Sequence, residues 1–309
     1  MPISRRHFLA RSAAAAAALP LASPHALLRP GARARRASFE PIRRGVGAYA
    51  GQGGTIGYLR SESALAAVDA QFPDSARAFL AGLRERAGDA GRGLDLLVNT
   101  HHHGDHTAGN AVLAPVADRH VAHEAVPGLQ RAAAVRYDAL GSQRYPTETF
   151  RRSWSVDLGD EVVSLLHVEP AHTAGDAVVH FERADVVHVG DLVFNRLHPF
   201  VDLAAGASTA GWSRTLQAVH DRFSDATAFV FGHANAAHGV VGTRADLLVM
   251  RDYLDGVRAY AAAALAEGRT AEELGAVGAA VPGFEAFDGD GWSLSQGHVL
   301  GAVVEELSR

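Results

Sequence analysis

The sequence has 309 residues, of which 48% are hydrophobic and 20% charged, as is typical of a soluble globular protein. It contains no cysteine and no lysine, which excludes disulfides, zinc–thiolate sites, iron–sulfur clusters, thiol nucleophiles, Schiff-base chemistry and P-loop phosphate binding. Its 17 histidines favour a metal site, because imidazole is the commonest metal ligand.

Residues 1–36 have the composition of a bacterial export signal. The twin arginines Arg5 and Arg6 precede an apolar, alanine-rich run over residues 13–22, a pattern that is similar to a Tat-type signal. The run is too short to span a bilayer. We therefore expect a periplasmic or secreted protein with no membrane span in the mature chain. A basic disordered tail is the alternative, and cleavage or retention of the leader stays open.

The charge of the remaining chain bears on its partners. Seven arginines and no acidic residue lie in residues 1–36, so the rest of the chain has a net charge of about −12. Such an acidic body argues against nucleic acid as a substrate or partner. We expect a small-molecule substrate, and the sequence leaves the oligomeric state unknown.

The body begins near Phe39, and its hydrophobic pattern changes between strand and helix periods. This pattern predicts a hairpin over residues 45–58, a strand over 64–70, a helix over 74–88, a strand over 94–98 and a helix over 122–140. Asp74 is expected to cap the first of these helices. Its apolar side is expected to carry Ala78, Leu80 and Leu83.

The second half of the chain again mixes strands with helices. We expect a hairpin over 156–168, strands over 177–181 and 186–189, a helix over 212–223, a strand over 228–231, a helix over 244–265, and helical residues over 270–309 around a glycine-rich break at 288–291. Strands that come early and recur after the midpoint predict two sheets between outer helices, an α/β sandwich.

Candidate metal ligands follow the strand at 94–98. His101, His103, Asp105 and His106 form the pattern H-x-H-x-D-H in a loop at the end of a buried strand. The spacing lets His101 and His103 reach one metal and lets Asp105 and His106 turn toward a second. We expect His102 to face away. A solvated histidine-rich turn is the alternative.

This pattern resembles the signature of the metallo-β-lactamase superfamily, and three further motifs follow in the family's order. His172 stands in the run Ala-His-Thr-Ala-Gly-Asp, Asp191 follows the strand at 186–189, and His233 follows the strand at 228–231. The resemblance implies an αββα sandwich over residues 37–309, with C-terminal helices from about residue 243 and metals in a cleft at the sheet edges.

The resemblance also implies a binuclear site. The residues that would bind one metal are His101, His103 and His172, those that would bind the other are Asp105, His106 and His233, and Asp191 would bridge both. Imidazole and carboxylate ligands suit two zinc ions, with iron or manganese as alternatives. A hydroxide shared by two metals attacks a carbonyl or phosphoryl centre, and we expect Asp105 also to orient it.

The expected activity is that of a binuclear zinc hydrolase acting on an ester, thioester, lactone or amide-type bond. The ligand set with Asp191 resembles the glyoxalase II-like branch, but that branch's basic glutathione-binding residues have no clear match here. A β-lactamase is one alternative, although the absent cysteine and the bridging aspartate argue against it. A mononuclear-iron persulfide dioxygenase, which is an oxidoreductase, is another, and a metal-binding protein without catalysis is a third.

The loop after Asp191, residues 192–202, is expected to line the cleft. We take His198 as a candidate catalytic residue and Asn195 as a candidate for a contact with the ligands or the substrate. The alternative for His198 is simple packing beside Pro199. Tyr145 is placed on a possible lid over residues 141–149, Trp212 is expected in the core, and the remaining histidines are expected to be structural.

Overall fold

The computed structural model describes residues 38–136, 140–276, 280–289 and 295–309, which belong to one compact unit, Arg33–Arg309. The expected export signal over residues 1–36 lies outside the described residues, as does part of the expected glycine-rich break. Among the described residues, no helix combines the length and the apolar character needed to cross a bilayer.

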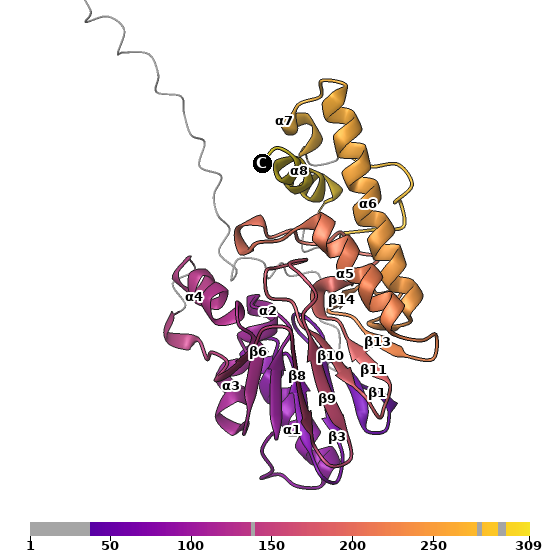
Figure 1. The fold of residues 1–309 in the computed structure, drawn as a ribbon. Helices are drawn as coiled ribbons and strands as arrows, with labels where there is room; N and C mark the ends of the chain where they lie inside the picture. The colour runs from indigo at the N-terminus through magenta and orange to yellow at the C-terminus, as the bar shows by residue number, and fades with distance from the viewer. Residues whose placement is uncertain (1–37, 137–139, 277–279, 290–294) are drawn as a thin grey trace, which may run out of the picture. The chain divides into compact units, whose positions relative to one another are not determined.

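Two sheets form the centre of this unit (Figure 1). The strands of the first sheet lie in chain order: β1 (Ser38–Arg43), β2 (Val46–Ala50), β3 (Ile56–Arg60), β4 (Leu65–Val68), β5 (Leu96–Asn99), β6 (His120–His123) and β7 (Glu148–Phe150). The first four pair antiparallel, and β4 to β7 pair parallel. The carboxyl ends of β4, β5 and β6 therefore share one edge of the sheet.

The second sheet has the order β15-β13-β11-β10-β9-β8. Its strands are β8 (Ser153–Asp157), β9 (Val162–Leu166), β10 (Val178–Phe181), β11 (Val186–His188), β13 (Ala228–Val230) and β15 (Val241–Gly242). β11 and β13 are parallel. Beyond their carboxyl ends, β12 (Phe194–Asn195) and β14 (His233–Ala234) pair as a short two-stranded sheet.

Helices complete the layers. They are α1 (Pro73–Ala87), α2 (Gly104–Thr107), α3 (Asn110–Leu113), α4 (Val126–Arg136), α5 (Thr209–Arg222), α6 (Arg244–Ala266), α7 (Ala271–Leu274) and α8 (Gln296–Leu307). Two short turns, η4 (Gly190–Leu192) and η5 (Leu203–Ala205), lie between β11 and α5.

Alternating side chains on each strand divide the core into layers. On β4, Ala66 and Val68 face a cluster between the two sheets, whereas Leu65 and Ala67 face a cluster with α1. On the second sheet, Val179 joins the cluster between the sheets, whereas Val178 joins a cluster with α5, α6 and α8. Three apolar layers between four layers of backbone make an αββα sandwich, so the predicted fold class is confirmed.

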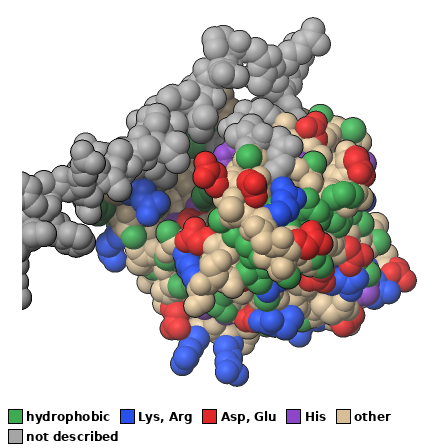
Figure 2. Space-filling model, turned by 90° about the horizontal axis from the view of Figure 1, so that it is seen from above, with side chains coloured by type: hydrophobic (Ala, Val, Ile, Leu, Met, Phe, Trp, Pro, Cys, Tyr) green, Lys and Arg blue, Asp and Glu red, His purple; other side chains and the backbone are tan. Residues whose placement is uncertain are grey.

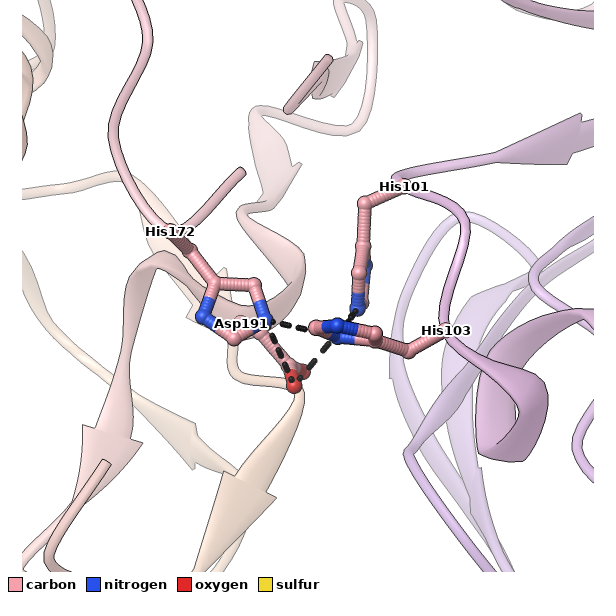
Figure 3. A group of neighbouring side chains, drawn as sticks. All are labelled: His101, His103, His172 and Asp191. Atoms are coloured by element: carbon pink, nitrogen blue, oxygen red, sulfur yellow. Dashed lines mark hydrogen bonds and ion pairs between the residues drawn. The ribbon is translucent and has the colours of Figure 1, made fainter. Parts of the chain in front are cut away.

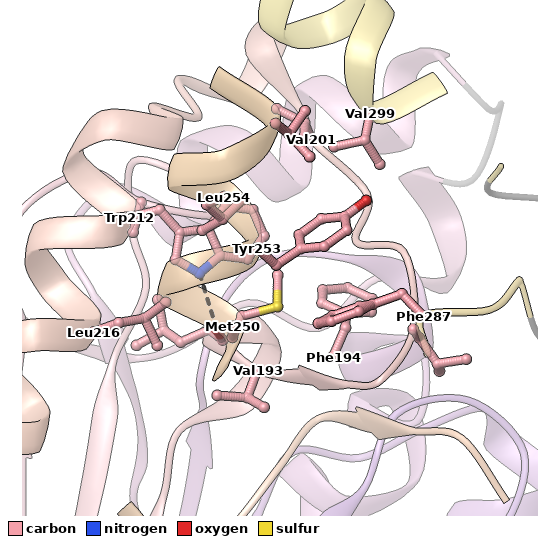
Figure 4. Close-up of a cluster of buried hydrophobic side chains, with 14 of the residues drawn as sticks. Val193, Phe194, Val201, Trp212, Leu216, Met250, Tyr253, Leu254, Phe287 and Val299 are labelled. Carbon is pink, nitrogen blue, oxygen red and sulfur yellow. Dashed lines mark hydrogen bonds between the residues drawn. The ribbon is translucent and has the colours of Figure 1, made fainter. Parts of the chain in front are cut away.

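The outer cluster of the second sheet is the largest and includes the C-terminal helices (Figure 4). Trp212 of α5 and Tyr253 of α6 are both fully buried in it, together with Val299 of α8. At the far end of α8, the carboxylate of Glu306 accepts hydrogen bonds from the backbone N–H of Thr209, 3.1 Å from each oxygen. The last helix therefore supplies an acceptor for the N-terminus of α5.

The structure corrects two predicted helices. Residues 122 and 123 belong to β6 instead of a helix, because this strand pairs with β5 on one side and β7 on the other. Helix α1 begins at Pro73, which suits the first helical position, and has no side-chain cap, so the predicted cap at Asp74 is wrong. Ala78 is exposed, and Phe79 occupies the buried side of α1 beside Leu80 and Leu83.

Charged side chains of both signs occupy the surface. On the face drawn in Figure 2, arginines are scattered among acidic side chains and do not form an extended basic surface among the described residues.

Candidate metal centre

Four segments that lie far apart in the sequence supply the predicted metal ligands. His101 and His103 follow β5, and His172 lies in the loop between β9 and β10. Asp191 lies in η4 directly after β11, and His233 begins β14 after β13. Figure 3 shows the first four of these side chains pointing toward one another from the two halves of the chain. Strand ends from both sheets therefore meet at one place.

The first ligand group consists of His101, His103 and His172. Nδ1 of His103 lies 3.0 Å from Nε2 of His101 and 3.0 Å from Nε2 of His172. Oδ2 of Asp191 lies 3.7 Å from the first of these Nε2 atoms and 3.6 Å from the second. One ligand atom from each of these four residues therefore lies within 4.8 Å of every other.

The second ligand group consists of Asp105, His106 and His233. Oδ2 of Asp105 lies 3.1 Å from Nε2 of His233 and 3.6 Å from Nε2 of His106. Asp191 joins the two groups, because its Oδ1 lies 3.0 Å from Nε2 of His106 and its Oδ2 lies 3.3 Å from Nε2 of His233. All seven predicted ligands are thus brought together, with Asp191 in the position expected of a bridging ligand.

Asp69 orients two of these ligands. This fully buried residue follows β4, the parallel neighbour of β5. Its Oδ2 accepts from Nδ1 of His106 over 2.8 Å and from the hydroxyl of Thr100 over 2.7 Å. Because the hydroxyl of Thr100 gives its proton to Asp69, Nδ1 of His101 is the donor in its 3.0 Å contact with that hydroxyl. Both imidazoles therefore direct Nε2 into the site, with a lone pair when the ring is neutral.

Asp202 orients His103 in the same way. Its Oδ2 accepts from Nε2 of His103 over 3.1 Å, which leaves Nδ1 for a metal. Nε2 of His102 lies 3.9 Å from the same oxygen. His102, His103 and Asp202 also have ligand atoms close enough together to hold a metal. However, Nε2 of His103 and Oδ2 of Asp202 are already joined by their own hydrogen bond.

The ring nitrogens of the first ligand group fit a bound cation. The orienting contacts leave lone pairs on Nε2 of His101 and Nδ1 of His103, and these two atoms cannot donate to each other when the rings are neutral. Oδ1 of Asp191 is buried without a hydrogen bond in the described part of the chain, although it forms an ion pair with His106 at 3.0 Å. A metal ion satisfies imidazole lone pairs and a carboxylate at once.

Burial and charge give the two groups different protonation. Burial lowers the pKa of His172 to about 3 and that of His101 well below its usual value, so both rings are neutral at pH 7. Burial acts in the same direction on His233, but the carboxylates of Asp191 and Asp105 outweigh it and raise the pKa of His233 to about 10.

The other members of the second ligand group follow the same pattern. Burial again disfavours the charged ring of His106, but Asp191, Asp105 and Asp69 together raise the pKa of this imidazole well above its usual value. Burial opposes ionisation of Asp105, yet His106 and His233 lower the pKa of this carboxyl group to about 2. The second group therefore holds protons between carboxylates, in places where a cation would replace them.

Two glycines permit close packing against the ligands. A Cβ atom on Gly232 would lie 2.0 Å from Oδ1 of Asp191, and a Cβ atom on Gly54 would lie 2.0 Å from Cε1 of His106. Neither contact is possible for a larger residue without displacing a ligand. Both positions therefore serve the site, although the sequence pattern did not single them out.

The structure places His198 among aromatic residues and not in either ligand group. Its Nδ1 shares a hydrogen bond of 2.9 Å with the hydroxyl of Tyr253, and its ring stacks on Phe287. Asn195 is buried in β12 and donates to the carbonyl of Gly239 over 3.0 Å. The contacts described for these residues are structural, and a catalytic role for His198 stays a prediction.

Two other expectations concerned aromatic residues. Trp212 is fully buried, as expected, and its Nε1 donates to the carbonyl of Leu192 over 2.9 Å. Its ring also lies 5.1 Å from that of His172, so it supports a ligand. The ring of Tyr145 lies 4.6 Å from the guanidinium of Arg131, and the lid function of its segment stays a prediction.

The fold and the two ligand groups define an αββα protein with a candidate metal centre at the edges of its sheets. The sequence profile of the metallo-beta-lactamase superfamily matches residues 53–275, which is more than half of the chain. The chain therefore belongs to the metallo-β-lactamase superfamily, whose members are mostly metallohydrolases. No curated protein matches the chain significantly.

Solved structures share this fold at low sequence identity. A metallo-beta-lactamase from Pontibacter korlensis has a TM-score of 0.59 and 18% identity, over 71% of this chain and 99% of that chain. The metallo-beta-lactamase DIM-1 has a TM-score of 0.56 and 15% identity, over 71% and 97% of the two chains. A double mutant of the sec-alkyl sulfatase PisA1 has a TM-score of 0.69 and 14% identity, over 88% of this chain and 50% of that chain.

Proposed function

We propose that the protein is a binuclear zinc hydrolase that uses hydroxide held between its metals to cleave an ester, thioester, lactone or amide-type bond. The observation that carries this proposal is the position of Asp191 between two complete ligand groups. Its Oδ1 lies 3.0 Å from His106, while its Oδ2 lies 3.6 Å from His172. A single carboxylate facing two groups suits two metals better than the one iron of a dioxygenase.

Zinc suits the ligand chemistry, with iron or manganese as alternatives. The set contains only imidazole nitrogens and carboxylate oxygens, which these metals accept. Two such ions, held by His101, His103 and His172 and by Asp105, His106 and His233, would lower the pKa of a water molecule and supply positive charge for the oxygen of the scissile bond.

The exposed ligands indicate where a substrate would enter. Asp105, His103 and His233 keep 13–16% of their side chains exposed, whereas Asp191 keeps 4%. Water and substrate would therefore reach the site past these three side chains, of which Asp105 is the carboxylate. Its pKa is lowered to about 2, so this carboxylate is ionised at neutral pH and can accept a hydrogen bond from the attacking water.

The chain's other residues hold this arrangement in place. Asp69 and Asp202 keep His106 and His103 in the orientation and tautomer that a metal requires. No side-chain nucleophile is needed, which agrees with a sequence that lacks both cysteine and lysine.

β-Lactam hydrolysis is the second candidate, because it breaks an amide bond with the same site chemistry. The fold of this chain is similar to that of two metallo-beta-lactamases over nearly their whole length, which supports β-lactam hydrolysis as a candidate activity. The sec-alkyl sulfatase shares the fold over a larger part of this chain and extends the candidate substrates to sulfate esters.

Metal content, measured together with hydrolysis, tests the proposal. We expect about two zinc ions per chain by elemental analysis, with hydrolysis of a thioester, a lactone or a chromogenic β-lactam. One iron per chain, no hydrolysis and oxygen uptake with a persulfide would replace the hydrolase with a dioxygenase. Two zinc ions per chain without hydrolysis of any of these substrates would also contradict the proposed hydrolase activity.

Export remains a proposal of its own, based on Arg5 and Arg6. Cell fractionation of the full chain should find it in the periplasm or medium, and replacing both arginines with lysine should retain it in the cytoplasm. Equal distribution of the two forms would contradict a Tat-type signal.

A further inference from the structure

An exposed aromatic ring lies beside one of the candidate metal ligands. The side chain of Phe200 is 43% exposed, and it is one of four large hydrophobic side chains exposed in the described part of the chain. Its ring centroid lies 5.5 Å from that of His103. An apolar group that covers the exposed face of this ring would gain roughly 25 cal/mol per Å² of apolar surface removed from water.

The loop that carries Phe200 is anchored on both sides. Val201 is buried in the core, and Asp202 accepts the hydrogen bond from His103 over 3.1 Å. Before the ring, the backbone N–H of His198 donates to the carbonyl of Asp288 over 3.0 Å. The ring is therefore held beside the ligands by neighbours with fixed positions, as a preformed contact surface requires.

The surroundings of the ligands carry little positive charge. In the described part of the chain, the ion pairs and hydrogen bonds of the two ligand groups are with aspartates, histidines and Thr100, and none is with an arginine. The arginine of the same loop, Arg196, pairs with Asp246 at 3.3 Å. The sequence has no lysine. A negative group on the substrate, away from the metals, would therefore find no cationic partner in this loop.

We infer that Phe200 determines specificity, by binding an uncharged aliphatic acyl chain of the substrate beside the metals. This inference rests on the proposed function and narrows it to neutral esters, thioesters or lactones with an apolar acyl part. Substrates with a second negative charge, such as a carboxylate distant from the scissile bond, are disfavoured.

Metal-binding ligands that are not cleaved test the inference directly. We would titrate the zinc-loaded protein with acetohydroxamate, octanohydroxamate and the monohydroxamate of suberic acid, by calorimetry. The octano ligand should bind the wild type at least about tenfold more tightly than the aceto ligand, which corresponds to roughly 60 Å² of buried apolar surface. The suberic ligand, with the same chain length but a terminal carboxylate, should lose most of this gain.

Variants identify the contact. Phe200→Ala should reduce the difference between octano and aceto ligands to less than about threefold, while Phe200→Leu keeps most of it. Val135→Ala removes another exposed apolar side chain, which is 64% exposed on α4, and should leave the difference unchanged. An equal chain-length dependence in Phe200→Ala and wild type, or equal affinity for the suberic ligand, would overturn the inference.

The experiment separates the two proposals. Chain-length dependence through Phe200, with no hydrolysis of any substrate, would refute the hydrolase and keep the apolar contact. Hydrolysis with no chain-length dependence in binding would refute the role of Phe200 and keep the hydrolase.

Discussion

The two ligand groups use the same kinds of side chain but hold protons differently. In the first, burial outweighs the carboxylates that act on His101 and His172, which are Asp191 on both and Asp202 on His172, and it keeps both rings neutral. In the second, carboxylates outweigh burial and hold protons on both rings, three of them acting on His106 and two on His233. Asp191 lies 3.7 and 3.6 Å from His101 and His172, but 3.0 and 3.3 Å from His106 and His233. The closeness of the carboxylates, and not the ligand type, therefore decides whether a histidine is neutral or protonated before a metal binds.

The largest expected effect comes from removing one ligand of either group. His103→Ala should empty the first group and Asp105→Ala should weaken the second, and turnover should fall at least about 10³-fold in both, because each metal supplies several kcal/mol of stabilisation. Elemental analysis should find the other metal retained. Circular dichroism checks that both variants fold, and full activity in either one would refute the mechanism.

Substitution of Gly232 or Gly54, the two glycines packed against the ligands, distinguishes the two ligand groups, because each added Cβ atom would meet a different ligand. Gly232→Ala brings a Cβ atom onto Asp191, the shared ligand, and should lower zinc affinity at both groups by at least about 10²-fold. Gly54→Ala brings one onto His106 and should weaken the second group only. Gly128→Ala, where the added atom meets nothing within 4 Å, is the control. Equal zinc content in all three variants would contradict the close packing.

Proton release should differ between the groups. Zinc must displace the proton of His233, whose pKa is raised to about 10, and that of His106, whose pKa is raised well above its usual value, so affinity at the second group should rise by up to about a hundredfold per pH unit from pH 6 to 8. Burial lowers the pKa of His172 to about 3 and that of His101 well below its usual value, so these two rings release no proton and affinity at the first group should depend much less on pH. Calorimetry of His103→Ala and Asp105→Ala, in two buffers of different ionisation enthalpy, isolates each group. The same proton release in both variants would contradict the different protonation of the two ligand groups.

The smallest expected effects come from the orienting aspartates. Asp202→Asn should lower zinc affinity at the first group about tenfold, which is the smallest effect expected when a residue that orients a ligand is changed. The effect is small because the amide oxygen of asparagine still accepts a hydrogen bond from His103. Asp69→Asn should affect both groups, since Asp69 contacts His106 directly and His101 through Thr100. Competition with a zinc chelator measures each affinity. No change in either variant would show that these contacts do not tune the site.

The ligands that could be predicted from the sequence are those that stand close together in one segment or belong to a family motif. His101 and His103 follow one strand two residues apart, so their pattern is visible in the sequence alone. Asp69 has no such signal, because it is a single aspartate after a strand, and only the parallel pairing of β4 with β5 brings it beside His106. Asp202 was missed although its loop was expected to line the cleft.

The remaining differences also come from contacts between distant segments. His198 was chosen in that loop because it is a histidine, but Tyr253 of α6 and Phe287 hold its ring. Residues 122 and 123 have no strong strand pattern of their own, and they form β6 because β5 and β7 lie on either side. The order of the layers could be predicted from the alternation of strand and helix patterns along the chain. The pairing of β6 with its neighbours and the contacts of His198 could not.

The hydrogen bonds of Glu306 to the N-terminus of α5 connect the last described helix to the metal-ligand region. Glu306 of α8 accepts from the backbone N–H of Thr209 at the start of α5. Trp212, one turn further along α5, lies against His172. Loss of α8 would remove an acceptor from the helix that supports a ligand more than a hundred residues away, so a change in this outer helix should alter metal affinity as well as stability.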